Sequence, residues 1–178
     1  MSVSVSSLAQ RGPVPALPPL EELEITHQAM MRTVAQLQEL LQRLQAEGPA
    51  EPLRRMAAEI RSFIDEEARE HHAQEDRHVF PGLLASQDDV LVGHVRRLQQ
   101  DHGWLEENWI ELGPQLDALA HDHHWVDPDV LGPMIEVYTA LLGEHIALEE
   151  SLIYPEARRR DAAEQIAAIH RQAKWLND

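Results

Sequence analysis

The chain has 178 residues, of which 43% are hydrophobic and 26% are charged, and this length can bury one sizeable core. Lysine and arginine total 15 against 31 aspartates and glutamates, so the net charge of -16 opposes binding to nucleic acid or to an anionic membrane surface. The absence of cysteine excludes thiolate metal sites, iron–sulfur clusters and disulfides. Any metal site must therefore be built from nitrogen and oxygen donors, and the chain has 11 histidines that can supply nitrogen.

The first segment, residues 1–19, contains several serines and four prolines and has no helical pattern. It lacks the basic start and the apolar stretch of a secretory signal. No part of the sequence approaches the roughly 20 consecutive apolar residues that a membrane-spanning helix needs. We therefore expect an N-terminal tail over residues 1–19 and a cytoplasmic protein.

From Leu20 onward, apolar residues recur every three or four positions, which is typical of amphipathic helices rather than strands. We expect a first helix that ends at Gly48-Pro49 and a second that ends at Pro81-Gly82. Their apolar faces comprise Leu20, Leu23, His27, Met30, Val34, Leu37, Leu41 and Leu44, and then Leu53, Met56, Ile60, Ile64, Ala68, His71, Glu75 and Val79.

The pattern predicts a third helix from Leu91 to Leu119, with a kink at Gly113-Pro114. A fourth begins after Asp127-Pro128 and ends at Pro155. Short connections between long amphipathic helices favour antiparallel neighbours. The sequence thus predicts an all-α protein. An up-down-up-down antiparallel four-helix bundle is expected over residues 20–155, with a short C-terminal helical extension over residues 156–178.

Each of the four predicted helices carries one histidine on its apolar face. These residues are His27, His71, His102 and His145. A single buried histidine is commonly a hydrogen-bonded core residue, but one per helix is a pattern. His71 and His145 are each followed four residues later by a glutamate, Glu75 and Glu149. Residues at this spacing share a helix face about 6 Å apart along the axis, so each pair can reach the same metal ion or adjacent ones.

The heights of these histidines along the bundle agree as well. His27 precedes the first turn by about twenty residues, and His71 follows that turn by a similar number. The same count holds for His102 and His145 about the turn between the third and fourth helices. Buried imidazoles and carboxylates without partners are costly, whereas one or two cations would satisfy them all. We therefore predict a metal site.

Three stretches of the sequence resemble the hemerythrin-like HHE cation-binding domains. They are "HHAQEDRHVFPGL" at 71–83, "DHGWLEENW" at 101–109 and "HIALEESLIYP" at 145–155. The first and third repeat one pattern: a histidine, a glutamate four residues on, another acid, then an aromatic residue and a proline. The resemblance covers about residues 20–155 and implies a helical bundle with a non-haem di-iron centre.

The resemblance implies a ligand for each position of that centre. The terminal ligands would be His27, His71, His102 and His145, and the bridging carboxylates would be Glu75 and Glu149. Two iron ions are the expected cofactor, and the donor set also suits zinc or manganese. The implied function is to bind or sense O2, NO or peroxide, or to handle iron under stress. The pattern assigns no enzymatic reaction, because it contains no organic-substrate cleft with an acid–base pair.

The sequence departs from oxygen-carrying hemerythrins at Glu106, which stands four residues after His102 where those proteins have a second histidine. Glu106 is either an extra ligand or a solvated acid. A ferritin-like di-iron oxidase or ferroxidase is the alternative function, since Glu24/His27 and Glu75/His78 have the Glu-x-x-His spacing of such sites. A metal-storage module without turnover is a further alternative.

The remaining histidines fit the site less well. His94 lies too far before His102 to share its ion, and His72 is rotated about 100° from His71, so we expect it to face outward or to lie behind the ligands. His121, His123 and His124 fall in a polar turn. The hydroxyls of Tyr138 and Tyr154 are candidate hydrogen-bond donors near the site, although a tyrosine on a helix face more often has a packing role.

Overall fold

The computed structural model describes residues 20–122 and 126–175, and within these ranges the chain is helical without a strand. The predicted tail at residues 1–19 and the predicted turn residues His123 and His124 lie outside the described residues. The helices are α1 (Leu20–Glu47), α2 (Glu51–Phe63), α3 (Arg69–Gln74), α4 (Phe80–Leu84), α5 (Asp89–Ala120), α6 (Pro128–Leu148) and α7 (Tyr154–Trp175). Three π-helical segments join some of them: η1 (Ile64–Ala68), η2 (Glu75–Val79) and η3 (Glu149–Ile153).

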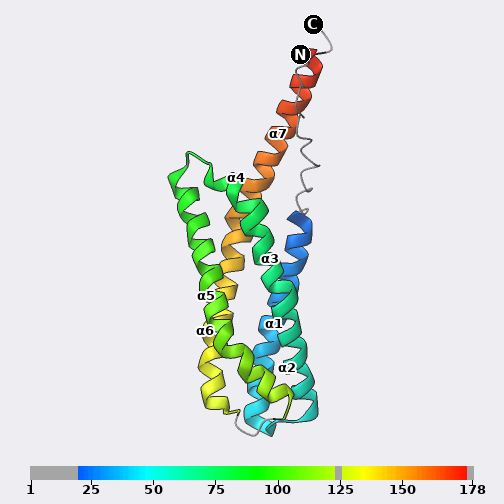
Figure 1. Ribbon diagram of the computed structural model, residues 1–178, viewed down its shortest axis with the longest axis vertical. Coiled ribbons are helices and arrows are strands. Elements are labelled where there is room, and N and C mark those ends of the chain that lie inside the picture. Colours follow the sequence, from blue (N-terminus) through cyan, green and yellow to red (C-terminus); the bar gives the residue numbers. More distant parts are fainter. Residues whose placement is uncertain (1–19, 123–125, 176–178) are drawn as a thin grey trace, which may run out of the picture.

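The elements form four long helical stretches, namely α1, α2 to α4, α5, and α6 to α7, which pack side by side (Figure 1). Helix α1 contacts α2 and α6, and α5 also contacts α2 and α6, so the stretches enclose a common interior. The predicted all-helical bundle is confirmed at this level. Among the described helices, none combines the length and the apolar composition that a membrane span requires.

Local sequence signals set most helix ends. Gly48 follows α1 with φ of +73°, a left-handed conformation that glycine adopts without a steric penalty. Asp88 caps α5, since its side chain accepts hydrogen bonds from the backbone N–H groups of Val90 and Leu91. Asp127 caps α6 in the same way. These caps satisfy backbone donors that would otherwise be left without partners at the helix starts.

The prediction that Pro81 and Pro155 end their helices is wrong, because the helical path continues through both. Pro81 lies in the first turn of α4 and Pro155 in the first turn of α7, each directly after a π-helical segment. In that segment the hydrogen bonds run to the fifth preceding residue, from Phe80 N–H to the Glu75 carbonyl and from Tyr154 N–H to the Glu149 carbonyl. We attribute the continuity to this widened turn, which tolerates a residue that cannot donate a backbone hydrogen bond.

Pro114 lies within α5, and the turns that follow it run obliquely to the rest of that helix (Figure 1). The bend agrees with the predicted kink. The side chain of Arg61 on α2 donates a hydrogen bond of 2.8 Å to the carbonyl of Gly113, beside the proline. The bend therefore brings the end of α5 against α2.

The core consists of two apolar clusters with a polar layer between them. The larger cluster is built from α1, α2, η1, α5 and α6, and it includes Leu37, Ile60 and Leu112. The smaller cluster lies around α4 and the start of α7, and it includes Phe80 and Ile153. Between the two lie six buried polar side chains, each 2% exposed or less: His27, His71, Glu75, Asp101, His145 and Glu149. The candidate functional residues therefore lie in the interior of the bundle.

Candidate metal centre

The structure brings the six predicted ligands together in this polar layer. They come from separate elements: His27 from α1, His71 from α3, Glu75 from η2, His102 from α5, His145 from α6 and Glu149 from η3. Their donor atoms form two groups, within each of which all atoms lie within 4.8 Å of one another. One group contains His27 and His71, the other contains His102 and His145, and both contain Glu75 and Glu149.

Each shared carboxylate faces both histidine pairs. Glu149 places Oε2 3.2 Å from Nε2 of His27 and Oε1 3.2 Å from Nε2 of His145. Glu75 places Oε2 3.4 Å from Nε2 of His71 and 3.5 Å from Nε2 of His102. Both glutamates are the first residue of a π-helical segment, an element that is frequent at functional sites. Two cations, one on each side, would be bridged by these carboxylates.

The two carboxylates differ in protonation although they lie side by side. Burial, together with the nearby charge of Glu75, raises the pKa of Glu149 to about 8. Burial also opposes the charge of Glu75, but His102, His71 and the Tyr154 hydroxyl bring its pKa below the ordinary range. Two buried carboxylates so close together do not both ionise readily, so in the metal-free protein Glu75 carries the charge and Glu149 holds a proton.

Several buried polar atoms of the layer have no hydrogen-bond partner among the described residues. They include both carboxylate oxygens of Glu149, Oε2 of Glu75 and both ring nitrogens of His71. In addition, Nε2 of His102 and Nε2 of His145 face each other at 3.2 Å, where at most one of them can donate. The lone pairs of these converging atoms repel one another, and burial keeps water from donating hydrogen bonds to them. Divalent cations would satisfy the carboxylate oxygens and one nitrogen of each imidazole, so the residues present fit a metal centre.

Acidic side chains lie beside the outer nitrogens of three of these histidines, within hydrogen-bond distance at His27 and His102 but not at His145. Glu150 Oε1 lies 3.3 Å from Nδ1 of His27, and Asp76 Oδ2 lies 3.1 Å from Nδ1 of His102. The buried Asp101 places Oδ2 3.8 Å from Nδ1 of His145. A carboxylate at Nδ1 favours the tautomer with its proton there, which leaves Nε2 free to face a metal. Sequence reasoning missed Asp76 and Asp101, although Asp76, like Glu150, directly follows a bridging glutamate.

Of the two positions expected for His72, facing outward or behind the ligands, the structure excludes the first. The ring of His72 stacks on His102, with centroids 4.3 Å apart and an interplanar angle of 23°, while His71 lies 4.7 Å from His27. Helix α3 belongs to the stretch from α2 to α4, which packs between α1 and α5. Two adjacent faces of this stretch therefore point into the interior of the bundle. The 100° step from one residue to the next carries His71 toward α1 and His72 toward α5.

Glu106, predicted as either a ligand or a solvated acid, is the latter. Its carboxylate pairs with Arg69 at 2.6 Å and its side chain is 40% exposed. Of the two tyrosines, Tyr154 donates a hydrogen bond of 2.5 Å to Oε1 of Glu75, as the sequence allowed. Tyr138 instead packs against Trp109, with ring centroids 5.7 Å apart.

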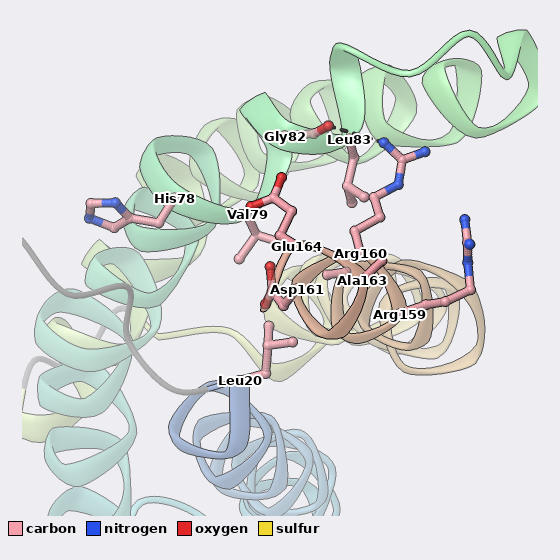
Figure 2. A pocket seen from close by; sticks show the side chains of 11 residues that line it. Leu20, His78, Val79, Gly82, Leu83, Arg159, Arg160, Asp161, Ala163 and Glu164 are labelled. Atoms are coloured by element: carbon pink, nitrogen blue, oxygen red, sulfur yellow. Dashed lines mark hydrogen bonds between the residues drawn. The ribbon is translucent and has the colours of Figure 1, made fainter. Parts of the chain in front are cut away.

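Cavities lie beside the polar layer and beside the smaller apolar cluster. A cavity of about 210 Å3 opens beside His72 and His102, and its walls combine apolar side chains such as Leu105 and Trp109 with charged ones such as Arg69 and Asp76. A second, of about 400 Å3, lies between α4 and the start of α7, with His78 on one side and Arg159 and Arg160 on the other (Figure 2). Within the part of the chain that the structure describes, neither His78 nor His94 belongs to a metal-compatible group.

The raised pKa of Glu149 leads to a prediction for metal binding. Below pH 8 its carboxyl must lose a proton to bind a cation, so we expect Zn2+ to release about one proton per chain at pH 7 from chelator-treated protein. The release should persist toward lower pH, where Glu149 stays protonated in the metal-free protein. It should fall toward zero above pH 8. Calorimetry in buffers of different ionisation enthalpy measures this number, and a pH-independent release would contradict the assignment.

Comparison with known proteins agrees with this geometry. The model of the family described as "Hemerythrin HHE cation binding domain" matches residues 19–157. A protein of Haemophilus influenzae (strain ATCC 51907 / DSM 11121 / KW20 / Rd), described only as "Uncharacterized protein", is 29% identical over 134 residues, which is 75% of this chain and 76% of that protein. No solved structure matches the chain. Because the family model covers the bundle and all six predicted ligands, this chain belongs to the hemerythrin HHE cation-binding domain family.

Proposed function

We propose that the protein holds two non-haem iron ions in the polar layer and uses them to bind or sense O2, NO or peroxide, or to handle iron under stress. The observation that carries this proposal is the sharing of two fully buried carboxylates, Glu75 and Glu149, between two pairs of histidines. A single cation would leave one pair of imidazoles facing the carboxylates without a partner. The arrangement therefore favours two ions over one.

The donor set also supports the choice of metal. Imidazole nitrogens and carboxylate oxygens suit iron, manganese and zinc, whereas calcium favours oxygen ligands alone. When bound, a pair of iron ions would supply two redox centres next to each other. The protein's own part is to fix the ligands from several helical elements, to exclude water with the two apolar clusters, and to place the Tyr154 hydroxyl against Glu75.

A small ligand has a route to this centre. The cavity of about 210 Å3 beside His72 and His102 is large enough for O2, NO or peroxide, and Leu105, Trp109 and Tyr138 line it. Its walls combine apolar and charged side chains, so it can admit uncharged diatomic molecules as well as peroxide. The Arg69–Glu106 ion pair lies at the same cavity, where it adds polar groups to the lining.

We also propose that the four long helical stretches run up-down-up-down. Turns of only a few residues join α1 to α2 and α4 to α5, and short connections favour antiparallel neighbours. This direction of the helices also explains how the four predicted histidines reach one level. The ferritin-like alternative is less compatible with the geometry, since Glu24 pairs with Arg158 at 2.6 Å and His78 lines a different cavity.

Metal content is the first test of the proposal. Protein produced with iron available and purified without chelators should retain close to two metal ions per chain, as elemental analysis can measure. A single tightly held ion would reduce the site to a mononuclear one. A protein without any bound transition metal, which also fails to take up iron or zinc afterwards, would contradict the proposal.

Reactivity then separates the candidate roles. Reduced, iron-loaded protein should be prepared without air and exposed in turn to O2, NO and hydrogen peroxide while the visible spectrum is followed. A reversible O2 adduct indicates a carrier or oxygen sensor, and a stable nitrosyl with irreversible oxidation by O2 indicates a role in nitrosative stress. Rapid turnover of added Fe(II) with mineral formation would instead support a ferroxidase. A spectrum that none of the three changes would indicate metal storage.

A further inference from the structure

A fifth histidine of the polar layer remains to be explained. We propose that His72 is a third imidazole ligand of the cation that His102 and His145 hold, so that the two cations differ in histidine count. This inference rests on the proposed function of the same site. It assigns a ligand role to a residue outside the six that the sequence predicted.

The position of His72 carries this assignment. Its ring centroid lies 4.3 Å from that of His102 and 5.3 Å from that of His145. One nitrogen from each of these three imidazoles lies within 4.8 Å of the other two. Metal–nitrogen bonds of about 2.0–2.1 Å place donors on opposite sides of one cation about 4 Å apart. Small side-chain adjustments would therefore bring all three nitrogens onto a single ion.

A packing role for His72 is a weaker explanation. Its Nε2 atom is buried and has no hydrogen-bond partner among residues 20–122 and 126–175. A buried donor or acceptor without a partner costs about 1–3 kcal/mol, which an apolar ring stacked on His102 would avoid. The unpartnered nitrogen therefore destabilises the metal-free fold, and a bound cation would remove this destabilisation.

Helix α5 supplies His102 to this cation but does not supply a further ligand. Glu106 is spaced from His102 as Glu149 is from His145, yet its carboxylate is bound to Arg69 at 2.6 Å. The neighbouring stretch α3 supplies a donor instead, because His71 and His72 point to opposite sides of the centre.

The assignment makes the two cations chemically unequal. With both carboxylates shared, one cation has three imidazoles and the other has two, from His27 and His71. The cation with two histidines then has more coordination positions left for an incoming molecule, although the cavity of about 210 Å3 opens on the other side of the centre, at His72 and His102. The Tyr154 hydroxyl lies on that side, 3.3 Å from Nε2 of His27, where it can donate to a bound ligand or to Glu75.

The test is a titration of chelator-treated, full-length protein with Co2+, followed by visible absorption and elemental analysis. We expect His72→Ala to keep one tight site and to bind the second Co2+ at least about tenfold more weakly, with a changed spectrum. His72→Phe should behave like His72→Ala, because it keeps the stacked ring but lacks the nitrogen. The matched control is His78→Ala, which removes another half-buried histidine about two turns further along the chain and should bind both ions as the wild type does.

The outcomes separate this inference from the proposed function. If His72→Phe binds Co2+ with the affinity and the spectrum of the wild type, the ring acts by packing and the assignment is overturned. This holds whether or not His72→Ala binds Co2+ more weakly. A wild-type protein that binds no Co2+ would overturn the proposed function, and the assignment with it. Circular dichroism of the two variants checks that the helices are intact.

Discussion

Glu149→Gln is expected to retain fewer than two metal ions, and the same change at Glu106 is expected to leave metal content unaltered. Glu149 is 0% exposed and belongs to both metal-compatible groups, so its loss removes a donor from each cation. Glutamine resembles the protonated carboxyl that burial favours in the metal-free protein, so the fold should survive the change. Elemental analysis after gel filtration measures the difference.

The control is a close one, because Glu75, Glu106 and Glu149 each stand four residues after a candidate histidine ligand. In sequence the three glutamates are equivalent, and the structure distinguishes them by burial and by the Arg69–Glu106 ion pair. Glu75→Gln and His71→Ala should also lose metal. Equal metal content in Glu149→Gln and Glu106→Gln would refute the ligand assignment.

Removal of the metal is expected to lower the melting temperature by roughly 10 °C or more. Each cation present at about a thousand times its dissociation constant stabilises the folded state by about 4 kcal/mol. For a chain of this size, 1 kcal/mol corresponds to about 2–4 °C. Thermal denaturation with and without a chelator, monitored by circular dichroism, measures the shift. A shift below a few degrees would contradict a buried centre of two ions.

The size of this shift should depend on pH. Glu149 has a folded-state pKa of about 8, above its ordinary value, so its contribution to metal-free stability is present at low pH and is lost as the pH rises to 8. Burial lowers the pKa of His71 to about 4, so this residue makes the folded protein more stable as the pH rises toward 6.5. Above pH 6.5 its contribution to stability no longer changes. Between pH 6.5 and 8 the metal-free protein should therefore become less stable while metal affinity increases, so the difference in melting temperature should widen.

The doubled pattern of histidine and glutamate was sufficient to predict the helical bundle and the residues that meet in its interior. Apolar periodicity identifies the buried face of each helix, and four-residue spacing places His71 with Glu75 and His145 with Glu149. These are relations within one helix, so they can be predicted without knowledge of the neighbouring helices. The common level of the histidines followed from counting residues to the turns.

Other features depended on contacts between helices. His72 faces the centre because α3 lies in a stretch with inward-pointing sides toward both α1 and α5, and Glu106 faces away because Arg69 is close enough to bind it. The same applies to Asp101, which became a partner of His145 through the packing of α5 against α6. Periodicity defines one apolar face per helix, but it does not define how wide an arc the neighbours cover or which charged side chain lies opposite. Those are properties of the packed bundle, and only the tertiary structure decided them.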